Sequence, residues 1–319
     1  MDIVQRPLGT RWTPSTTAQE VGTGIDLSGR LAVVTGGTSG LGLETVRVLS
    51  MLGAHVIATA RSTGAASALQ GMAHVETAQL ELSDPGSIDG FTSWFRARGK
   101  PLDLLILNAG IMAAPLTRDQ FGNESQFATN HLGHFRLAVG LWPSLREAMG
   151  ARIVSLSSRG HQIGGFDLED LGFEKRPYNK WLAYGQSKTA NSLFAVAADA
   201  RGQRDGIRAY SVHPGSIVGP LARHLTTEEI AGFGALSEDG SPVIDPATDK
   251  KTFAQGAATT VWCATSADLQ EIGGVYCENS DIASVEREAR KGVRPYAIDS
   301  MIAHSLWEKS VELTGGDVS

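Results

Sequence analysis

The sequence predicts a doubly wound α/β fold, in which one parallel sheet is covered by helices on both faces. Short runs of Val, Ile and Leu alternate with segments of helical length from residue 31 onward. These runs are continuously apolar, as in strands that are buried on both sides. A glycine-rich turn directly follows the first run, at residues 36–42. We therefore expect a Rossmann-type parallel sheet of about seven strands in a single domain.

The apolar runs place the predicted strands along the chain. The clear strand signals are LAVVTGG, HVIATARS, LDLLILNAG, ARIVSLSS, IRAYSVHPG and GGVYCENS, with helical patterns such as GLETVRVLSMLG between them. We expect an N-terminal arm at 1–27, the nucleotide-binding domain at 28–290 and a C-terminal extension at 291–319. A turn-rich insertion at about 221–250 follows the sixth strand.

Composition narrows the classes of partner. The chain has 28 basic and 34 acidic residues, a formal net charge of -6, and no dense basic run. Neither nucleic acid nor a membrane is therefore expected as a partner. No window reaches the roughly 18 apolar residues of a membrane span, which predicts a soluble, cytoplasmic protein. Cys263 and Cys277 are expected to be reduced core thiols without metal-ligand spacing, and neither His161 nor His213 has ligand spacing with another His, Asp or Glu, so no metal is expected.

The glycine-rich turn VVTGGTSGLG predicts a seat for a dinucleotide. Gly36, Gly40 and Gly42 let the backbone approach a pyrophosphate, and the following helix N-terminus offers free N–H groups. The spacing G-x-x-x-G-x-G differs from the commoner G-x-G-x-x-G, and a purely structural glycine turn is the alternative. The cofactor-binding residues expected in this turn are Gly36, Thr38, Ser39, Gly40, Leu41 and Gly42.

The end of the second strand predicts the type of nucleotide. A carboxylate at this point would hold the ribose 2′-hydroxyl of NAD, but this chain has Ala60, Arg61 and Ser62. Arg61 can instead make a charge-assisted contact with a 2′-phosphate. The sequence therefore favours NADP(H) over NAD(H), with Arg61 and Ser62 as cofactor contacts and a solvated surface arginine as the alternative.

Tyr184 and Lys188 lie one helical turn apart in the stretch WLAYGQSKTANSLF. A nearby ammonium stabilises a phenolate, so Lys188 is expected to lower the pKa of Tyr184 toward neutrality for general acid/base work. The alternative is a tyrosine at the edge of the core beside a solvated lysine.

Over residues 30–285 the chain resembles the short-chain dehydrogenase/reductase family. TGGTSGLG is similar to the cofactor loop of that family, LNAG (107–110) to its fourth-strand motif, YGQSK to its Tyr-x-x-x-Lys, and HPG (213–215) to its turn beside the nicotinamide. TNHLGHF, SSRGH and LWEKSVELTG look most like the retinol-dehydrogenase-like branch. The chain lacks a hydrophobic anchor, which argues against carrying retinoid specificity over.

The resemblance implies four catalytic residues, Asn130, Ser158, Tyr184 and Lys188. It implies that Tyr184 exchanges a proton with the substrate oxygen while Ser158 hydrogen-bonds the same oxygen. Lys188 would bind the nicotinamide ribose, and Asn130 would hold a water that links Lys188 to solvent.

Two departures from the family pattern affect the cofactor contacts. Glu81 stands where an Asp usually meets the adenine, so that contact is expected from the backbone of Leu82. Gly219 stands where a Thr usually meets the nicotinamide carboxamide, so that contact is expected from the backbone around Ser216 and Ile217. The remaining implied cofactor contacts are Asn108, Ala109, Gly110, Tyr184, Lys188, Pro214 and Gly215.

Two segments are predicted to border the substrate. The loop before Tyr184 carries Phe166, Phe173, Tyr178 and Trp181, which favours an apolar or aromatic carbonyl or alcohol, unless these rings only anchor the loop. Residues 221–250 are predicted to form a mobile lid, with a short helix that starts near Thr226 and presents Leu225, Ile230 and Phe233.

The expected function is therefore NADP-dependent interconversion of a carbonyl and an alcohol on a small apolar molecule. The same tyrosine and cofactor also suit reduction of a C=C bond conjugated to a carbonyl. A catalytically idle nucleotide-sensing protein with this fold is the alternative outside enzymology. No motif fixes the oligomeric state, and a homodimer is kept open.

Overall fold

A computed structural model describes residues 5–62 and 67–318 and contains one eight-stranded sheet in the order β3-β2-β1-β4-β5-β6-β7-β8. All neighbouring strands are parallel except β7 and β8, which form an antiparallel pair. The strands are β1 (Leu31–Thr35), β2 (His55–Ala60), β3 (Val75–Gln79), β4 (Leu104–Leu107), β5 (Arg152–Leu156), β6 (Arg208–His213), β7 (Val275–Glu278) and β8 (Asp281–Ile282). The predicted Rossmann-type fold is confirmed.

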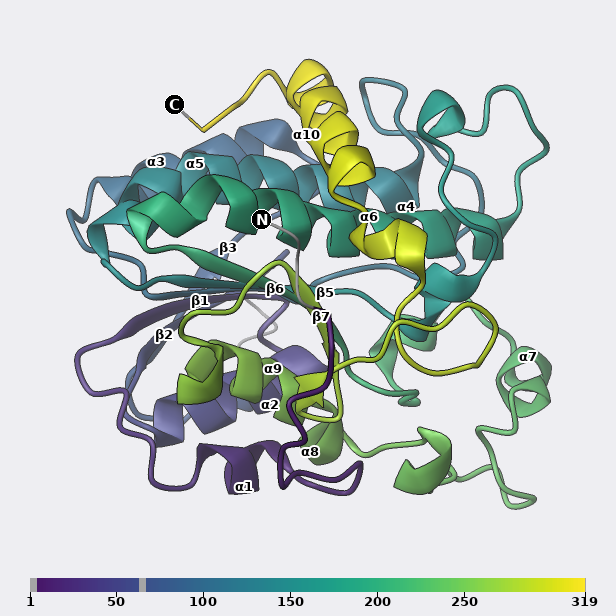
Figure 1. Ribbon diagram of the computed structural model, residues 1–319, viewed down its shortest axis with the longest axis horizontal. Coiled ribbons are helices and arrows are strands. Elements are labelled where there is room, and N and C mark those ends of the chain that lie inside the picture. Colours follow the sequence, from purple (N-terminus) through teal and green to yellow (C-terminus); the bar gives the residue numbers. More distant parts are fainter. Residues whose placement is uncertain (1–4, 63–66, 319) are drawn as a thin grey trace.

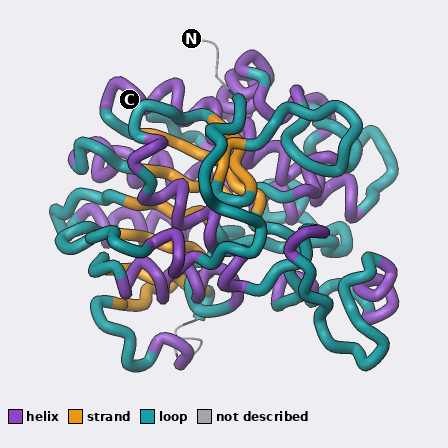
Figure 2. Tube along the Cα trace, turned by 60° about the horizontal axis from the view of Figure 1, so that its bottom comes forward, coloured by secondary structure: helices purple, strands orange, loops and turns teal. Residues whose placement is uncertain are grey.

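Helices cover both faces of this sheet (Figure 1), and the strands run through the middle of the molecule (Figure 2). The α-helices are α1 (Ala18–Gly22), α2 (Gly40–Met51), α3 (Pro85–Arg96), α4 (Ser125–Phe127), α5 (Gly133–Glu147), α6 (Lys180–Gly202), α7 (Thr227–Gly232), α8 (Phe253–Gly256), α9 (Ala258–Thr265) and α10 (Ser300–Thr314). Helices α3, α5, α6 and α10 lie on one side, and α1, α2, α8 and α9 on the other.

Short helical turns complete the secondary structure. One of them, η2 (Ala128–Leu132), is π-helical and joins α4 to α5. The 3-10 turns are η3 (Arg159–Gln162), η4 (Leu168–Asp170), η5 (Gln203–Asp205), η6 (Pro220–Ala222), η7 (Pro246–Thr248), η8 (Ala267–Leu269) and η9 (Pro295–Ile298).

Successive residues of each strand enter different cores, which explains why the strands are continuously apolar. In β1, Val33 packs with the core beneath α3, α5 and α6, while Ala32 and Val34 pack with the core beneath α2 and α9. The edge strand β3 has the sequence VETAQ and is only partly buried, so its apolar signal is weak. Cys263 and Cys277 are buried and free, as expected of core thiols.

Residues before β1 pack on the sheet edge and on the helices below it. The side chain of Gln5 hydrogen-bonds the backbone of Tyr276 at both its N–H and its carbonyl, at 2.9 and 2.8 Å. Helix α1 begins after Thr17, whose hydroxyl and the Glu20 carboxylate form a capping box.

The C-terminal helix α10 is anchored in the core by Trp307, which is 1% exposed. Its ring lies edge-on to Phe135 at a centroid distance of 4.8 Å and is stacked with Phe194 at 6.0 Å. The guanidinium of Arg201 lies over the ring at 4.3 Å, and the indole N–H donates to Asp317 at 3.0 Å. These contacts fasten α10 onto α5 and α6.

We predict that Trp307→Ala lowers the free energy of unfolding by about 3–5 kcal/mol, because it leaves a large cavity between three helices. Met301, which is 79% exposed on the same helix, provides the control Met301→Ala. Urea unfolding followed by circular dichroism measures both variants. Equal midpoints for the two variants would show that α10 contributes little to the core.

Candidate active site

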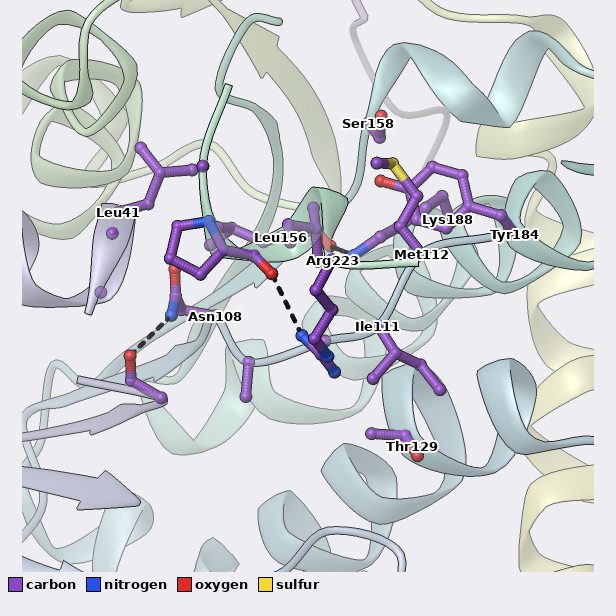
Figure 3. A pocket seen from close by; sticks show the side chains of 18 of the residues that line it. Leu41, Asn108, Ile111, Met112, Thr129, Leu156, Ser158, Tyr184, Lys188 and Arg223 are labelled. Atoms are coloured by element: carbon purple, nitrogen blue, oxygen red, sulfur yellow. Dashed lines mark hydrogen bonds between the residues drawn. The ribbon is translucent and has the colours of Figure 1, made fainter. Parts of the chain in front are cut away.

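A cavity of 1210 Å³ opens at the carboxyl ends of the parallel strands. This volume exceeds the about 300–1,000 Å³ of common small-molecule sites and leaves room for a dinucleotide and a second molecule. Figure 3 shows Leu41 and Asn108 at one end of the cavity, and Ser158, Tyr184 and Lys188 at the other. All predicted cofactor-binding residues line it: Gly36, Thr38, Ser39, Gly40, Leu41, Gly42, Arg61, Ser62, Leu82, Asn108, Ala109, Gly110, Tyr184, Lys188, Pro214, Gly215, Ser216 and Ile217.

The glycine-rich turn has the properties of an anion-binding loop. Gly36 and Gly40 have φ values of +64° and +55°, which glycine adopts without strain. A side chain at Gly42 would collide with the carbonyl oxygen of Gly36. Ser39 precedes α2 without capping it through its side chain, so the first N–H groups of α2 remain available to a pyrophosphate. The turn therefore fits the dinucleotide that the sequence predicts.

Two arginines, Arg61 and Arg223, line the cavity. Neither Arg61 nor Arg223 has a carboxylate partner among the described residues, and Arg223 donates only a long bond of 3.4 Å to the Pro220 carbonyl. Burial and, next, repulsion by Arg61 lower the pKa of Arg223, so the two guanidiniums are near one another. Two unpaired guanidiniums suit a phosphate group. The sequence pattern at the end of the second strand points to Arg61, but no pattern points to Arg223, which lies in the insertion.

A buried hydrogen-bond chain fixes the strand ends beneath the cofactor loop. The hydroxyl of Thr35 accepts from the backbone N–H groups of Asn108 and Ala109 at 2.8 and 3.0 Å. Its own hydrogen points to His134 Nε2 at 2.9 Å, since His134 Nδ1 must donate to the Asn130 carbonyl at 3.0 Å. Burial lowers the pKa of His134 to about 4, which keeps the ring neutral. No sequence pattern predicts these roles of Thr35 and His134, because their partners are distant in the chain.

Tyr184 and Lys188 meet on α6, as their spacing predicts. Lys188 Nζ lies 5.7 Å from the centroid of the Tyr184 ring and donates to the Leu156 carbonyl at 2.9 Å. Asn191, on the same face of α6, also donates to that carbonyl at 2.9 Å. Figure 3 shows the phenol and the ammonium at the same end of the cavity.

The expected direction of the Tyr184 pKa shift is wrong for this structure. Burial raises the pKa of Tyr184 to about 12, although a hydrogen bond with Ser158 acts in the opposite direction. Burial also lowers the pKa of Lys188 to about 8. The ammonium faces the Leu156 carbonyl rather than the phenol oxygen, so desolvation outweighs its attraction for a phenolate.

Ser158 follows β5 and faces Tyr184 across the cavity. Its hydroxyl oxygen accepts from the Gly160 N–H at 3.0 Å, so its hydrogen can be donated to Tyr184, with which Ser158 shares a hydrogen bond, or to a substrate oxygen. A side chain at Gly160 would lie 2.7 Å from the Tyr184 ring, so only glycine permits this approach. The neighbouring Ser157 does not compete for the site, because its hydroxyl donates to the Lys188 carbonyl at 2.7 Å.

Asn130 lies in the π-helical turn η2 but does not line the cavity. Its Oδ1 accepts from the Ile111 N–H at 2.8 Å, and its amide hydrogens go to the Ile111 carbonyl and the Ser187 hydroxyl, both at 2.9 Å. Both amide hydrogens are thus used inside the protein. A water that bridges Asn130 and Lys188 would therefore have to donate to an oxygen of Asn130. In this structure the Asn130 side chain connects the loop after β4 to α6.

The two departures from the family pattern have structural explanations. A Cβ at Gly219 would lie 2.6 Å from Cζ of Phe253, so the Phe253 ring fills the space of a side chain at this position. The same ring lies near Gly40 and connects the two loops. The Glu81 carboxylate accepts from the N–H and the hydroxyl of Ser83 at 3.0 and 2.9 Å.

The predicted aromatic border of the substrate pocket is wrong. Phe166, Phe173, Tyr178 and Trp181 do not line the cavity. Phe173 is buried against Tyr178, and the Tyr178 hydroxyl donates to the Ala114 carbonyl at 2.8 Å. Phe173 and Tyr178 anchor the loop, as the alternative interpretation expects, whereas Trp181 contacts Phe233 of the insertion. Side chains from other segments form the apolar wall: Ile111, Met112, Ala114, Pro115, Leu221 and Phe233.

The insertion at 221–250 contains the expected helix, α7, which begins after Thr226 in a capping box with Glu229. No residue of α7 is buried, and the helix stands at the edge of the molecule (Figure 1). It is held by an ion pair between Glu229 and Lys180 and by an edge-on contact of Phe233 with Trp181 at 5.3 Å. Leu221, Arg223, Phe233 and Lys250 of the insertion line the cavity.

Within the described ranges, no three His, Cys, Asp or Glu side chains group as a metal site requires. None of the helices in that part of the chain has the length and apolarity needed to cross a membrane.

Comparisons with known proteins identify the family of this chain. The family model described as "short chain dehydrogenase" matches residues 30–230. A Streptomyces antibioticus protein named "Probable oxidoreductase" is 44% identical over 295 residues, which cover 89% of this chain and 97% of that protein. Human retinol dehydrogenase 12 is 35% identical over 300 residues, covering 92% of this chain and 89% of the human protein.

A solved structure of an uncharacterized protein from Mycobacterium paratuberculosis is also similar. It has a TM-score of 0.73 and 32% sequence identity, and the match covers 97% of this chain and 100% of that one. The chain belongs to the short-chain dehydrogenase/reductase family and is retinol-dehydrogenase-like within it.

Proposed function

We propose that this protein is an NADP-dependent oxidoreductase that interconverts a carbonyl and an alcohol on a small, largely apolar molecule. Family membership implies a nicotinamide nucleotide cofactor. The observation that carries the proposal is the convergence of Ser158, Tyr184 and Lys188 at one end of a cavity whose lining also includes the glycine loop and two arginines without a carboxylate partner among the described residues.

The side chains divide the chemistry between them. When bound, the nicotinamide supplies or accepts the hydride. Tyr184 gives its phenolic proton to the oxygen of the carbonyl as negative charge develops there, and Ser158 donates a hydrogen bond to the same oxygen. Lys188, buried beside the Tyr184 ring, supplies positive charge that favours the phenolate left after proton transfer.

The protonation state of Tyr184 supports the reducing direction. Because burial raises the pKa of Tyr184 to about 12, the phenol carries its proton at neutral pH and is ready to donate it. Oxidation of an alcohol needs the phenolate instead, which is scarce at neutral pH.

The wall of Ile111, Met112, Leu221 and Phe233 supports an apolar substrate. A panel of ketones, aldehydes, enones and alcohols, assayed with NADPH and NADP by absorbance at the nicotinamide band, tests the proposed function. Turnover confined to carbonyls and alcohols supports it. Turnover only at the C=C bond of enones, or none with cofactor bound, contradicts it.

We predict that Tyr184→Phe lowers kcat at least about 100-fold and leaves the Kd of NADPH nearly unchanged, because only the proton donor is removed. Tyr210→Phe is the control, since the Tyr210 hydroxyl is equally buried but donates to the Leu269 carbonyl outside the cavity. Steady-state kinetics and NADPH fluorescence measure both quantities. More than a tenth of the original kcat in Tyr184→Phe contradicts the assigned role.

We predict that Arg61→Asp raises KM for NADPH at least about tenfold and affects KM for NADH much less. The change removes a charge-assisted contact worth about 1.5–3 kcal/mol and adds a repulsion. Arg223→Ala should raise the same KM, since Arg223 is the neighbouring guanidinium. Arg96→Asp, an exposed change outside the cavity, is the control. An equal loss with both nucleotides would assign Arg61 to the fold instead.

We propose further that residues 221–250 close over the substrate as a lid. The exposed α7 and the half-exposed Phe233, at 56%, support a segment with little packing of its own. Amides of residues 225–233 should gain protection from hydrogen exchange when NADPH and a substrate analogue bind together. Amides of α10 should not change. Unchanged exchange at 225–233 contradicts the lid.

A further inference from the structure

Two buried histidines hold the single peptide unit that follows Ser158. His161 Nδ1 lies 2.7 Å from the Ser158 carbonyl oxygen, and His213 Nδ1 lies 3.0 Å from the Arg159 nitrogen. This carbonyl and this N–H belong to the same peptide plane. Imidazole rings therefore hold both the carbonyl and the N–H of the peptide plane that orients the Ser158 side chain.

These bonds determine which ring nitrogen carries hydrogen. The Ser158 carbonyl can only accept, so His161 Nδ1 donates, while His161 Nε2 accepts from the Arg294 N–H at 3.1 Å. The Arg159 N–H can only donate, so His213 Nδ1 accepts and its Nε2 carries the hydrogen. Burial lowers the pKa of both rings, to about 3 for His161, which keeps them neutral.

The hydrogen on His213 Nε2 points to Asp249, at a distance of 2.7 Å from Oδ2. Asp249 is the second-to-last residue of the insertion and has a φ of +70°, a left-handed conformation that is costly for most residues. Its carbonyl accepts from the Ser216 N–H at 2.7 Å, and the Lys251 N–H donates to the Ser216 carbonyl at 3.0 Å. The backbone thus holds Asp249 in place while its carboxylate fixes the tautomer of His213.

Asp249 lies in a cluster of two cations, Arg159 and Lys251, and two carboxylates, Asp249 itself and Glu278. The Arg159 guanidinium pairs with Glu278 at 2.8 Å and lies 3.6 Å from Asp249. Lys251 Nζ donates to the Asn279 side chain at 2.6 Å. Burial acts to raise the pKa of Asp249, but the interaction with His213, which donates its Nε2 hydrogen to the carboxylate, and attraction by the Arg159 guanidinium outweigh it and lower that pKa to about 2. Asp249 is therefore a stable carboxylate acceptor.

We infer that Asp249 is a positioning residue, which orients Ser158 through His213 and the peptide plane between Ser158 and Arg159. The inference rests on the proposed role of Ser158 as a hydrogen-bond donor to the substrate oxygen. It links the insertion that lines the substrate to the serine that meets the reacting oxygen. The side chain of Asp249 also lines the cavity, so the test must separate action through His213 from direct contact.

Two substitutions at Asp249 separate its hydrogen bond from its backbone conformation. Asp249→Gly removes the side chain and suits a φ of +70°, whereas Asp249→Asn keeps an oxygen acceptor and also tolerates this conformation. We expect Asp249→Gly to lower kcat at least about tenfold, with KM for NADPH changed less than about twofold, and Asp249→Asn to keep kcat within about threefold. Asp239→Gly, at the exposed tip of the same insertion, is the control.

A double-mutant cycle tests the route through His213. His213→Phe should lower kcat as Asp249→Gly does, and adding Asp249→Gly to His213→Phe should lower it less than about threefold further. Full additivity of the two effects overturns the inference. Three other results would also overturn it. They are a kcat of Asp249→Gly within threefold of the original, a loss of kcat in Asp249→Asn equal to that in Asp249→Gly, and an effect of Asp249→Gly on KM for NADPH alone.

Hydrogen exchange of backbone amides measures how firmly the Ser158–Arg159 peptide is held, and it does not depend on turnover. The amides of Arg159 and Gly160 should exchange faster in Asp249→Gly and at the original rate in Asp249→Asn. Faster exchange in a protein that turns over no carbonyl or alcohol would refute the proposed function and leave the positioning intact. Unchanged exchange in Asp249→Gly overturns the positioning itself.

Discussion

The attachment of α6 to the end of β5 is the constraint on which the rest of the site depends. The Leu156 carbonyl accepts from both Lys188 and Asn191, each at 2.9 Å. One residue later, the Ser157 hydroxyl donates to the Lys188 carbonyl, and Ser192 donates to Ser157 at 2.9 Å. All of these groups are buried, so breaking any bond would leave a polar atom without a partner. This seam fixes the distance between Tyr184 on the helix and Ser158 on the loop.

Further buried hydrogen bonds connect this junction of α6 and β5 to the loop after β4 and to the first strand. Asn130 connects the loop after β4 to Ser187 on the inner turn of α6. The chain from Asn130 through His134 to Thr35 continues to the first strand and its glycine turn. The site is therefore one connected set of buried hydrogen bonds rather than separate cofactor and catalytic halves, which explains why polar residues occupy so much of the core around α6.

The sequence predicts the features that depend on neighbouring residues, and it fails for features whose partners are distant in the chain. The strands, the glycine turn, Arg61 and the helix of Tyr184 and Lys188 are specified by neighbouring residues, and the structure has them where the local patterns place them. The loop aromatics were misjudged because their partners, such as the Ala114 carbonyl for Tyr178, are distant in sequence. Arg223 and the ring of Phe253 against Gly219 were missed for the same reason. The shift of the Tyr184 pKa was given the wrong sign because spacing reports the nearness of a charge but not the loss of water.

The amide of Gln5 has a consequence for how the sheet ends. This side chain accepts from the Tyr276 N–H and donates to the Tyr276 carbonyl, which also accepts from the Ala283 N–H at 2.9 Å, so it reinforces the pairing of β7 with the residue after β8. It also donates to the Ala283 carbonyl at 2.7 Å, while the Asp281 carboxylate accepts from the N–H groups of Leu8 and Gly9. An unpaired strand edge invites pairing with another chain. Here β8, Ala283 and residues 5–9 together cover that edge, so a second copy could extend the sheet past β7 only by displacing them.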